Sequence, residues 1–144
     1  SDLGGNLDVV REMIDAPNSL IGLGDGGAHV GIMCDATSTS YTLTHWTRDR
    51  KRGSLFPVAW GVKRLTADNA IEMGLSDRGL LRPGLKADIV VFNPATIIDK
   101  ATFEKPHQYA EGFSFVIVNG QVVFENGQMT EARPGRVLYG PGRR

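Results

Sequence analysis

The spacing of apolar residues along the chain changes at about Leu75. Before that point apolar residues recur every three to four positions, which is the period of a helix that buries one face. Asn6 is placed to cap the first of these segments. The spacing predicts four helices: residues 7–15, residues 41–51, residues 57–65 and a short one that ends at Met73. Because these helices are amphipathic, each needs a sheet or another helix to cover its apolar face.

After Leu75 the apolar runs are short and are separated by turn residues, which is typical of β-strands. Asn119-Gly120 favours the two-residue type I′ turn of a hairpin, and Asn126-Gly127 offers a second turn of the same kind. We therefore expect a meander, a domain boundary near residues 76–79, and two domains at residues 1–75 and 76–144. Four runs are expected as strands: Leu80–Leu81, Ala87–Phe92, Phe113–Val118 and Gln121–Glu125.

Between the first two helices, the apolar run Leu20–Leu23 leads directly into a glycine-rich loop. Such a run predicts a strand buried on both faces, as in a parallel sheet covered by helices. Asp25 lies between Gly24 and Gly26-Gly27, so a ligand or metal could approach the backbone closely. Barrel and open α/β folds carry their catalytic residues at the carboxyl ends of such strands. Asp25 is therefore the candidate catalytic residue; the alternative is a tight turn in which it caps the next segment.

The predicted helices have more apolar surface than this one predicted strand can cover. A single strand cannot cover the apolar faces of several helices, and an exposed strand edge would promote aggregation. Either a sheet is missing from the chain, or another chain supplies it.

Composition and charge exclude several classes of function. The chain has 16 Lys and Arg against 16 Asp and Glu, so charge gives no reason to expect nucleic acid or a membrane surface as a partner. No apolar stretch approaches the roughly 18 residues of a membrane span. The single cysteine, Cys34, excludes an internal disulfide and favours a reducing, cytoplasmic compartment. Five arginines are interpreted as solvated helix faces: Arg11, Arg48, Arg50, Arg52 and Arg64.

Several segments resemble a known family, and they cover nearly the whole chain from Asp8 onward. They are similar to the carboxyl-terminal part of the N-acyl-D-amino-acid deacylases, or D-aminoacylases, of the amidohydrolase superfamily. The Asp25 loop together with His45-Trp46 points to the deacylase branch, whereas the segment at residues 81–92 marks the superfamily broadly. The segments are Gly22-Leu23-Gly24-Asp25-Gly26-Gly27-Ala28-His29-Val30, Thr44-His45-Trp46-Thr47-Arg48-Asp49-Arg50, Leu65-Thr66-Ala67-Asp68-Asn69-Ala70 and Leu81-Arg82-Pro83-Gly84-Leu85-Lys86-Ala87-Asp88-Ile89-Val90-Val91-Phe92.

The resemblance implies an α/β fold, with the last strand and helices of a metal-dependent (β/α)₈ barrel followed by strands of a small β-sandwich-like domain. It implies one or two divalent metals, usually zinc, and a small-molecule N-acyl amino acid as substrate. Asp25 matches the aspartate that ligates or faces the metal, takes a proton from the attacking water and passes it to the leaving amine. A metal lowers the pKa of bound water toward roughly 7, and a nearby carboxylate can then shuttle the proton.

The remaining candidates lie in or near the same loop. Gly26, Gly27 and His29 are the candidate substrate-binding residues, although a histidine that only structures the loop is an equal alternative. His45-Trp46 is expected to pack within its helix. Cys34 is expected to be an inert thiol, and His107 a surface residue.

The family's paired histidines and most of its barrel have no counterpart in the chain, and a barrel needs about 250 residues. We therefore expect one piece of an enzyme, or one chain of a split enzyme, inactive alone and with an incomplete metal site. The remainder of the barrel or a complementary chain would be its partner. The parent protein is expected to hydrolyse the amide of N-acyl-D-amino acids. The alternatives are cyclic amide or imide hydrolysis, and a non-catalytic remnant or binding module that keeps the β domain.

Overall fold

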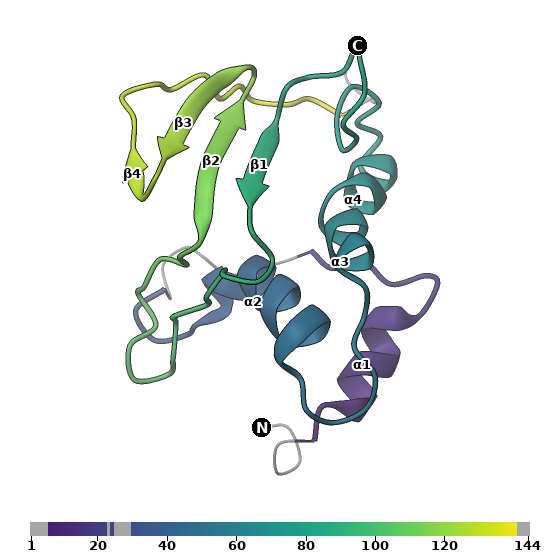
Figure 1. Ribbon diagram of the computed structural model, residues 1–144. Helices are drawn as coiled ribbons and strands as arrows, with labels where there is room; N and C mark the ends of the chain where they lie inside the picture. The colour runs from purple at the N-terminus through teal and green to yellow at the C-terminus, as the bar shows by residue number, and fades with distance from the viewer. Residues whose placement is uncertain (1–5, 23, 25–29, 141–144) are drawn as a thin grey trace.

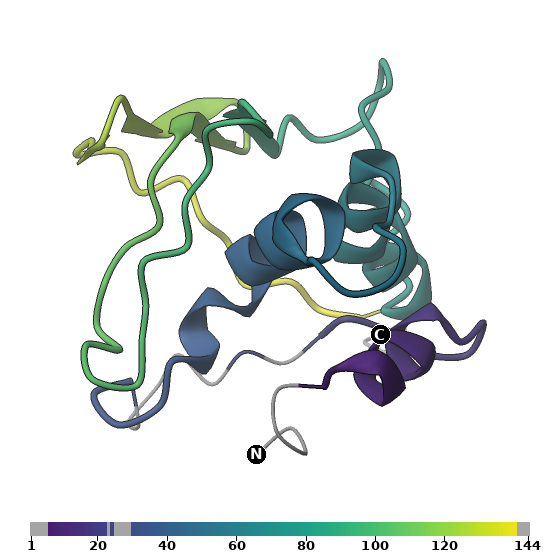
Figure 2. The same ribbon diagram turned by 60° about the horizontal axis from the view of Figure 1, so that its bottom comes forward.

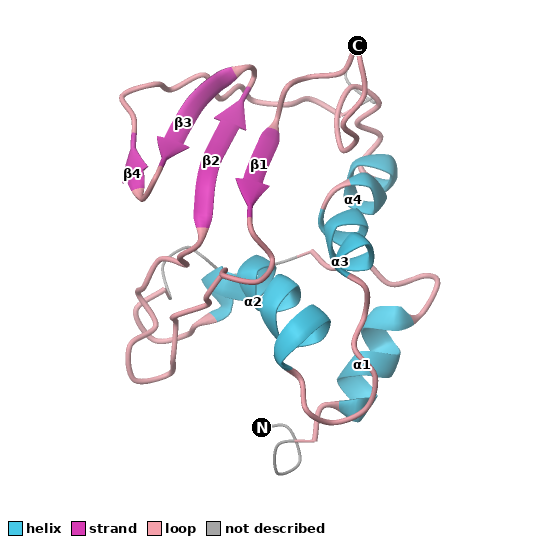
Figure 3. Cartoon of the chain, in the orientation of Figure 1, coloured by secondary structure: helices cyan, strands magenta, loops and turns pink. Residues whose placement is uncertain are grey.

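The computed structural model describes residues 6–22, 24 and 30–140, and its helices precede its strands (Figures 1 and 3). None of the helices described is long and apolar enough to cross a membrane. The helical elements are α1 (Asp8–Asp15), the 3₁₀ turn η1 (Asp35–Thr37), α2 (Ser38–Thr44), the π-helical turn η2 (His45–Asp49), α3 (Val58–Leu65) and α4 (Ala67–Glu72). The strands are β1 (Ile89–Phe92), β2 (Phe113–Val118), β3 (Gln121–Glu125) and β4 (Gln128–Met129).

The helices predicted from apolar spacing are present, but the one predicted at residues 41–51 starts earlier and continues after Thr44 as the π-helical turn η2, which ends at Asp49. The Oδ1 atom of Asn6 accepts a hydrogen bond from the Asp8 backbone N–H at 3.0 Å, as predicted for a residue that caps α1. α2 begins at Ser38 rather than at Tyr41. Its hydroxyl side chains bond back to carbonyls of the preceding turn, so they fit within a helix instead of extending the loop.

The strands form one antiparallel sheet in the order β1-β2-β3-β4, so the predicted meander is confirmed. Asn119 and Gly120 both have positive φ, of 48° and 79°, which is the type I′ geometry expected between β2 and β3. Asn126 and Gly127 repeat this geometry between β3 and β4. The strand expected at Leu80–Leu81 is wrong, because these residues run through an exposed loop with no strand beside them. Among the described residues the strands make one sheet and no second, facing sheet.

The strand predicted at Leu20–Leu23 is also wrong for the residues that the structure describes there, and Leu23 lies outside them. A strand needs a neighbour that pairs with its backbone, and no described strand runs beside this segment. Here side chains, rather than a second strand, donate hydrogen bonds to the backbone carbonyls. Arg64 donates to the carbonyl of Ser19, and Asn69 donates to the carbonyl of Ile21.

The long connection between β1 and β2 reaches from the sheet back to the start of α2 (Figures 1 and 2). Residues 106–110 of this connection line a common hollow with residues 36–40 of η1 and α2. Ile97, in the same connection, is fully buried. The other buried apolar residues lie among the helices: Leu43, Trp46, Phe56, Ala67 and Ala70. The helical part and the sheet are thus joined by this connection, while the proposed division into domains at residue 76 stays a prediction.

The outer faces of several helices remain uncovered. Val9 and Met13 of α1 are 58% and 63% exposed, and Ile71 of α4 is 74% exposed. Val9 and Met13 belong to the apolar stripe from which the first helix was predicted. The structure therefore supports the imbalance noted in the sequence, since no described element covers these side chains.

Candidate functional site

The predicted site residues Asp25, Gly26, Gly27 and His29 lie outside the described residues. The structure instead describes the chain on both sides of them, at residues 19–22 and 24 and from Val30 onward.

Gly24 lies directly before Asp25 and packs against the start of α2. A Cβ atom placed on Gly24 would lie 2.7 Å from Ser38 Oγ and 2.8 Å from the Asp35 carbonyl oxygen. Side-chain carbon atoms do not approach other atoms so closely in proteins, so only glycine fits here without a shift. At Gly24 the close approach is made by η1 and the start of α2, and the approach of a ligand or metal beside Asp25 stays a prediction.

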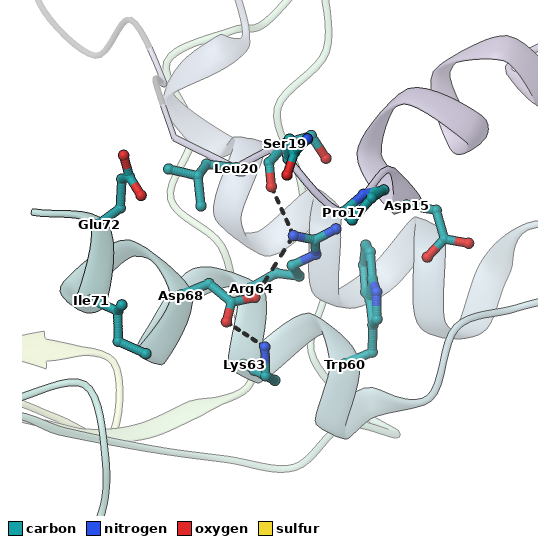
Figure 4. A pocket seen from close by; sticks show the side chains of 11 residues that line it. Asp15, Pro17, Ser19, Leu20, Trp60, Lys63, Arg64, Asp68, Ile71 and Glu72 are labelled. Carbon is teal, nitrogen blue, oxygen red and sulfur yellow. Dashed lines mark hydrogen bonds and ion pairs between the residues drawn. The ribbon is translucent and has the colours of Figure 1, made fainter.

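Arg64 holds the chain before the loop. Its guanidinium donates to the carbonyl of Ser19 at 2.7 Å (Figure 4). It also donates to the carbonyls of Ile14 at 2.9 Å and Ala16 at 3.0 Å. Two of these carbonyls belong to the C-terminal end of α1, where helical carbonyls lack partners and the helix dipole favours a cation. Arg64 is buried, with 9% of its surface exposed, and Asp68 lies 3.7 Å away as its counter-charge.

Asn69 binds the chain at Ile21, two residues after Ser19. Its Nδ2 atom donates to the Ile21 carbonyl at 2.7 Å. Its Oδ1 atom is buried and has no hydrogen-bond partner among the described residues. A buried amide oxygen without a hydrogen-bond partner lowers the stability of the fold. The bond to the Ile21 carbonyl is the stabilising hydrogen bond that this side chain makes among the described residues.

A cavity of about 670 Å³ lies beside these bonds, between α3, α4 and residues 15–20 (Figure 4). Its wall carries Trp60 and the charged groups of Lys63, Arg64 and Asp68. Lys63 pairs with Asp68, and Arg64 is bonded to the carbonyls named above. These three charged groups are therefore paired within the structure, and the carboxylates of Asp15 and Glu72 also line the cavity.

His45 begins the π-helical turn η2 and lies within an aromatic cluster. Its ring stacks on Tyr41 with centroids 4.7 Å apart and meets Trp46 edge-on at 4.8 Å. Burial, and then the positive charge of Arg50, lowers the pKa of His45. The imidazole is therefore neutral at neutral pH, and the expectation that His45-Trp46 packs within its helix is confirmed.

Two of the five arginines interpreted as solvated are in fact buried. Arg50 is 7% exposed, pairs with Asp8 and lies over the Trp46 ring at 5.1 Å. Arg64 is the other. Asp8 also binds Arg52 at 2.7 Å, and this hydrogen bond is the main reason that its pKa is lowered. The interpretation failed because spacing on a helix cannot reveal which charged faces meet carbonyls or carboxylates of another segment.

The described residues contain no group of three or more His, Cys, Asp or Glu that could hold a metal ion. His107 is exposed, as expected, and its ring lies 6.3 Å from that of Tyr109. Cys34 is half-buried and free. The described part of the chain by itself therefore does not fit a divalent metal site, and Asp25 and His29 lie outside it.

Sequence reasoning missed Arg64 and Asn69 as residues that hold the flank of the Asp25 loop. Arg64 was interpreted as part of a solvated helix face, and Asn69 entered only as a member of the segment at residues 65–70 that carries the family resemblance. The weak signal was a cation and an amide close to the junction of two predicted helices, where the chain can turn toward another segment. Their partners are backbone carbonyls some 45 to 50 positions away, and no side-chain pattern marks a carbonyl.

The sequence and the backbone of this chain were compared with those of known proteins. Residues 4–124 match the family model described as the amidohydrolase family. The D-aminoacylase of Alcaligenes xylosoxydans xylosoxydans is 44% identical over 96 residues, which cover 67% of this chain and 19% of that protein. The chain thus spans about a fifth of the length of this relative.

Two solved structures resemble the chain. A D-aminoacylase variant in complex with copper chloride aligns with a TM-score of 0.65 and 43% identity, over 69% of this chain and 20% of that one. The N-acyl-D-glutamate deacylase of Bordetella bronchiseptica, complexed with zinc and a phosphonate inhibitor, aligns with a TM-score of 0.53 and 35% identity. That match covers 65% of this chain and 20% of that one.

Proposed function

The chain belongs to the amidohydrolase family, and from this membership we propose that the complete protein is an N-acyl-D-amino-acid deacylase. It would hydrolyse the amide of an N-acyl-D-amino acid to a carboxylate and a free amino acid. The observation that carries the proposal is the agreement of sequence and backbone with a D-aminoacylase, at 43% identity and a TM-score of 0.65. The proposal includes the remainder of a barrel, in the same chain or in a partner, because this chain spans only 20% of that protein.

Within this proposal Asp25 moves the proton. A carboxylate accepts a proton from water as the water attacks the amide carbon, and it returns the proton to the nitrogen that leaves. The glycines beside Asp25 leave room for a substrate, and Gly26, Gly27 and His29 are proposed to contact it. At Gly24 that space is filled by Ser38 and the Asp35 carbonyl, so the room for a substrate is proposed on the side of Gly26 and Gly27.

We also propose that the complete protein uses one or two divalent metal ions, with zinc as the first candidate. The support comes from related structures, which were solved with copper and with zinc. When bound, such an ion supplies an activated water. The described residues offer no cluster of ligands for it, so its ligands must come from Asp25 and from parts of the protein beyond those described.

The test is Asp25→Asn in the complete protein, assayed for release of free amine from N-acyl-D-amino acids with neutral and acidic side chains. Asparagine has nearly the same shape and caps turns equally well, but it cannot accept a proton at neutral pH. We expect kcat to fall by about 10²–10⁴-fold, the usual contribution of a general acid–base, with folding and metal content unchanged.

Three other results would contradict parts of this proposal. Activity within a few fold of wild type would remove Asp25 from the mechanism. Loss of metal together with activity would make Asp25 mainly a ligand. A wild-type protein that releases no amine from any N-acyl-D-amino acid would refute the deacylase function itself.

A further inference from the structure

Arg64 and Asn69 lie on consecutive helices and bond to one continuous segment, residues 14–21. Together they donate four hydrogen bonds to its backbone carbonyls, at Ile14, Ala16, Ser19 and Ile21. That segment ends four residues before Asp25. We propose that Arg64 and Asn69 are positioning residues, which fix the path of the chain into the Asp25 loop; their catalytic effect rests on the proposed function.

The bonds to Ser19 and Ile21 use carbonyls on one side of the segment. In an extended segment, the carbonyls of residues i and i+2 point to the same side. Arg64 and Asn69 occupy this side at Ser19 and Ile21, where no described strand lies. Two side chains, one from α3 and one from α4, therefore hold this side of the segment.

Arg64 itself is held in place. Asp68 lies 3.7 Å from its guanidinium, and the Trp60 ring lies beneath it at 5.6 Å (Figure 4). Only 9% of the residue is exposed, so little water competes for its donors. A planar guanidinium can reach several carbonyls at once, whereas a lysine ammonium acts as a single charged point. This makes arginine suited to joining the end of α1 to the segment that follows it.

A positioning role differs from general stability in one measurable way. If Asn69 acts on catalysis only by placing Asp25, its removal must matter less once the Asp25 carboxylate is gone. If Asn69 merely stabilises the fold, its removal must lower activity by the same factor whether or not the carboxylate is present. The two roles therefore predict different results from the same set of variants.

The experiment uses the complete protein with Asn69→Ala and Arg64→Lys, each alone and combined with Asp25→Asn. Lys63→Ala is the matched control, because Lys63 precedes Arg64 on α3 and its ammonium binds Asp68 rather than residues 14–21. Two measurements are made on each protein: kcat and KM for an N-acyl-D-amino acid, and amide hydrogen exchange of peptides covering residues 14–22.

We expect Asn69→Ala to speed hydrogen exchange of this segment and to lower kcat by about 10–100-fold, the range for lost supporting contacts around a catalytic group. KM should change by less than about threefold, and in the Asp25→Asn background the loss in kcat should shrink to within about twofold. Arg64→Lys, which retains the charge and one donor group, should lie between wild type and Asn69→Ala. Lys63→Ala should match wild type in both measurements.

Two outcomes would overturn the inference. One is hydrogen exchange of residues 14–22 that stays at the wild-type rate in both Asn69→Ala and Arg64→Lys. The other is an equal fold loss of kcat from Asn69→Ala with and without the Asp25 carboxylate. If the wild-type protein shows no deacylase activity, the proposed function fails while the exchange rates alone still decide whether the two side chains hold the segment.

Discussion

Gly24→Ala tests the contact between the Asp25 loop and α2. The added Cβ would lie 2.7 Å from Ser38 Oγ and 2.8 Å from the Asp35 carbonyl oxygen, about 0.6 Å or more inside ordinary contact distance. Ser38 could rotate away, but the Asp35 oxygen belongs to the backbone of η1 and cannot. Overpacking of this kind costs about 1–3 kcal/mol and displaces the backbone. A displacement near 1 Å next to a catalytic group lowers its activity by about 10²-fold.

The neighbouring Gly22 provides a matched control. A Cβ on Gly22 would meet no described atom within 4 Å. Gly22→Ala is therefore expected to leave activity within a few fold of wild type and to change stability by no more than about 0.4–1 kcal/mol, through the unfolded chain. Adding Ser38→Ala to Gly24→Ala should recover only part of the loss, because the clash with the Asp35 carbonyl remains.

The assay combines urea denaturation with kcat measured on the complete protein. We expect a lower urea midpoint and a lower kcat for Gly24→Ala than for Gly22→Ala. Equal stability and equal kcat in the two variants would refute the packing of Gly24 against α2. Full recovery by Ser38→Ala would show that only the side chain, and not the η1 backbone, limits the space.

Two further predictions concern pH and the buried connection between the sheet and the helices. Burial and the charge of Arg50 lower the pKa of His45, so the unfolded chain binds a proton first as pH falls below about 6.5. The stability linked to His45 is complete above that pH and is lost as pH falls toward the pKa of the folded state; urea midpoints measured from pH 7.5 to 5 should fall less in His45→Phe than in wild type. Ile97 is fully buried whereas Ile98 is 49% exposed, so Ile97→Ala should cost about 2–5 kcal/mol in urea denaturation and Ile98→Ala much less, and equal costs would contradict the burial.

Sequence reasoning recovered the elements that depend on local interactions. The hairpin at Asn119-Gly120 was predictable because two adjacent residues with positive φ define the turn and alternating apolar residues define the strands. The helices were predictable from apolar spacing, since the buried face of a helix repeats every turn. Leu43 and Trp46 are buried as that spacing requires.

Other elements depend on what lies beside them. The apolar run Leu20–Leu23 has the composition of a buried strand, but a strand exists only where a second strand pairs with its backbone. The carbonyls of Ser19 and Ile21 are bonded instead by Arg64 and Asn69. Leu80–Leu81 likewise has apolar composition and no partner.

The candidate site also has some features that are local in the sequence and others that depend on tertiary contacts. The sequence alone singled out the Asp25 loop, because a carboxylate among glycines after an apolar run is a local pattern, and it indicated the family through motifs that the family match bears out. Only the tertiary structure decided that Gly24 must be glycine, since that depends on Ser38 and the Asp35 carbonyl. It also decided that Arg64 is buried against carbonyls rather than solvated. Backbone carbonyls are the same in every residue, so a sequence records which donors a chain has but not which carbonyls they will meet.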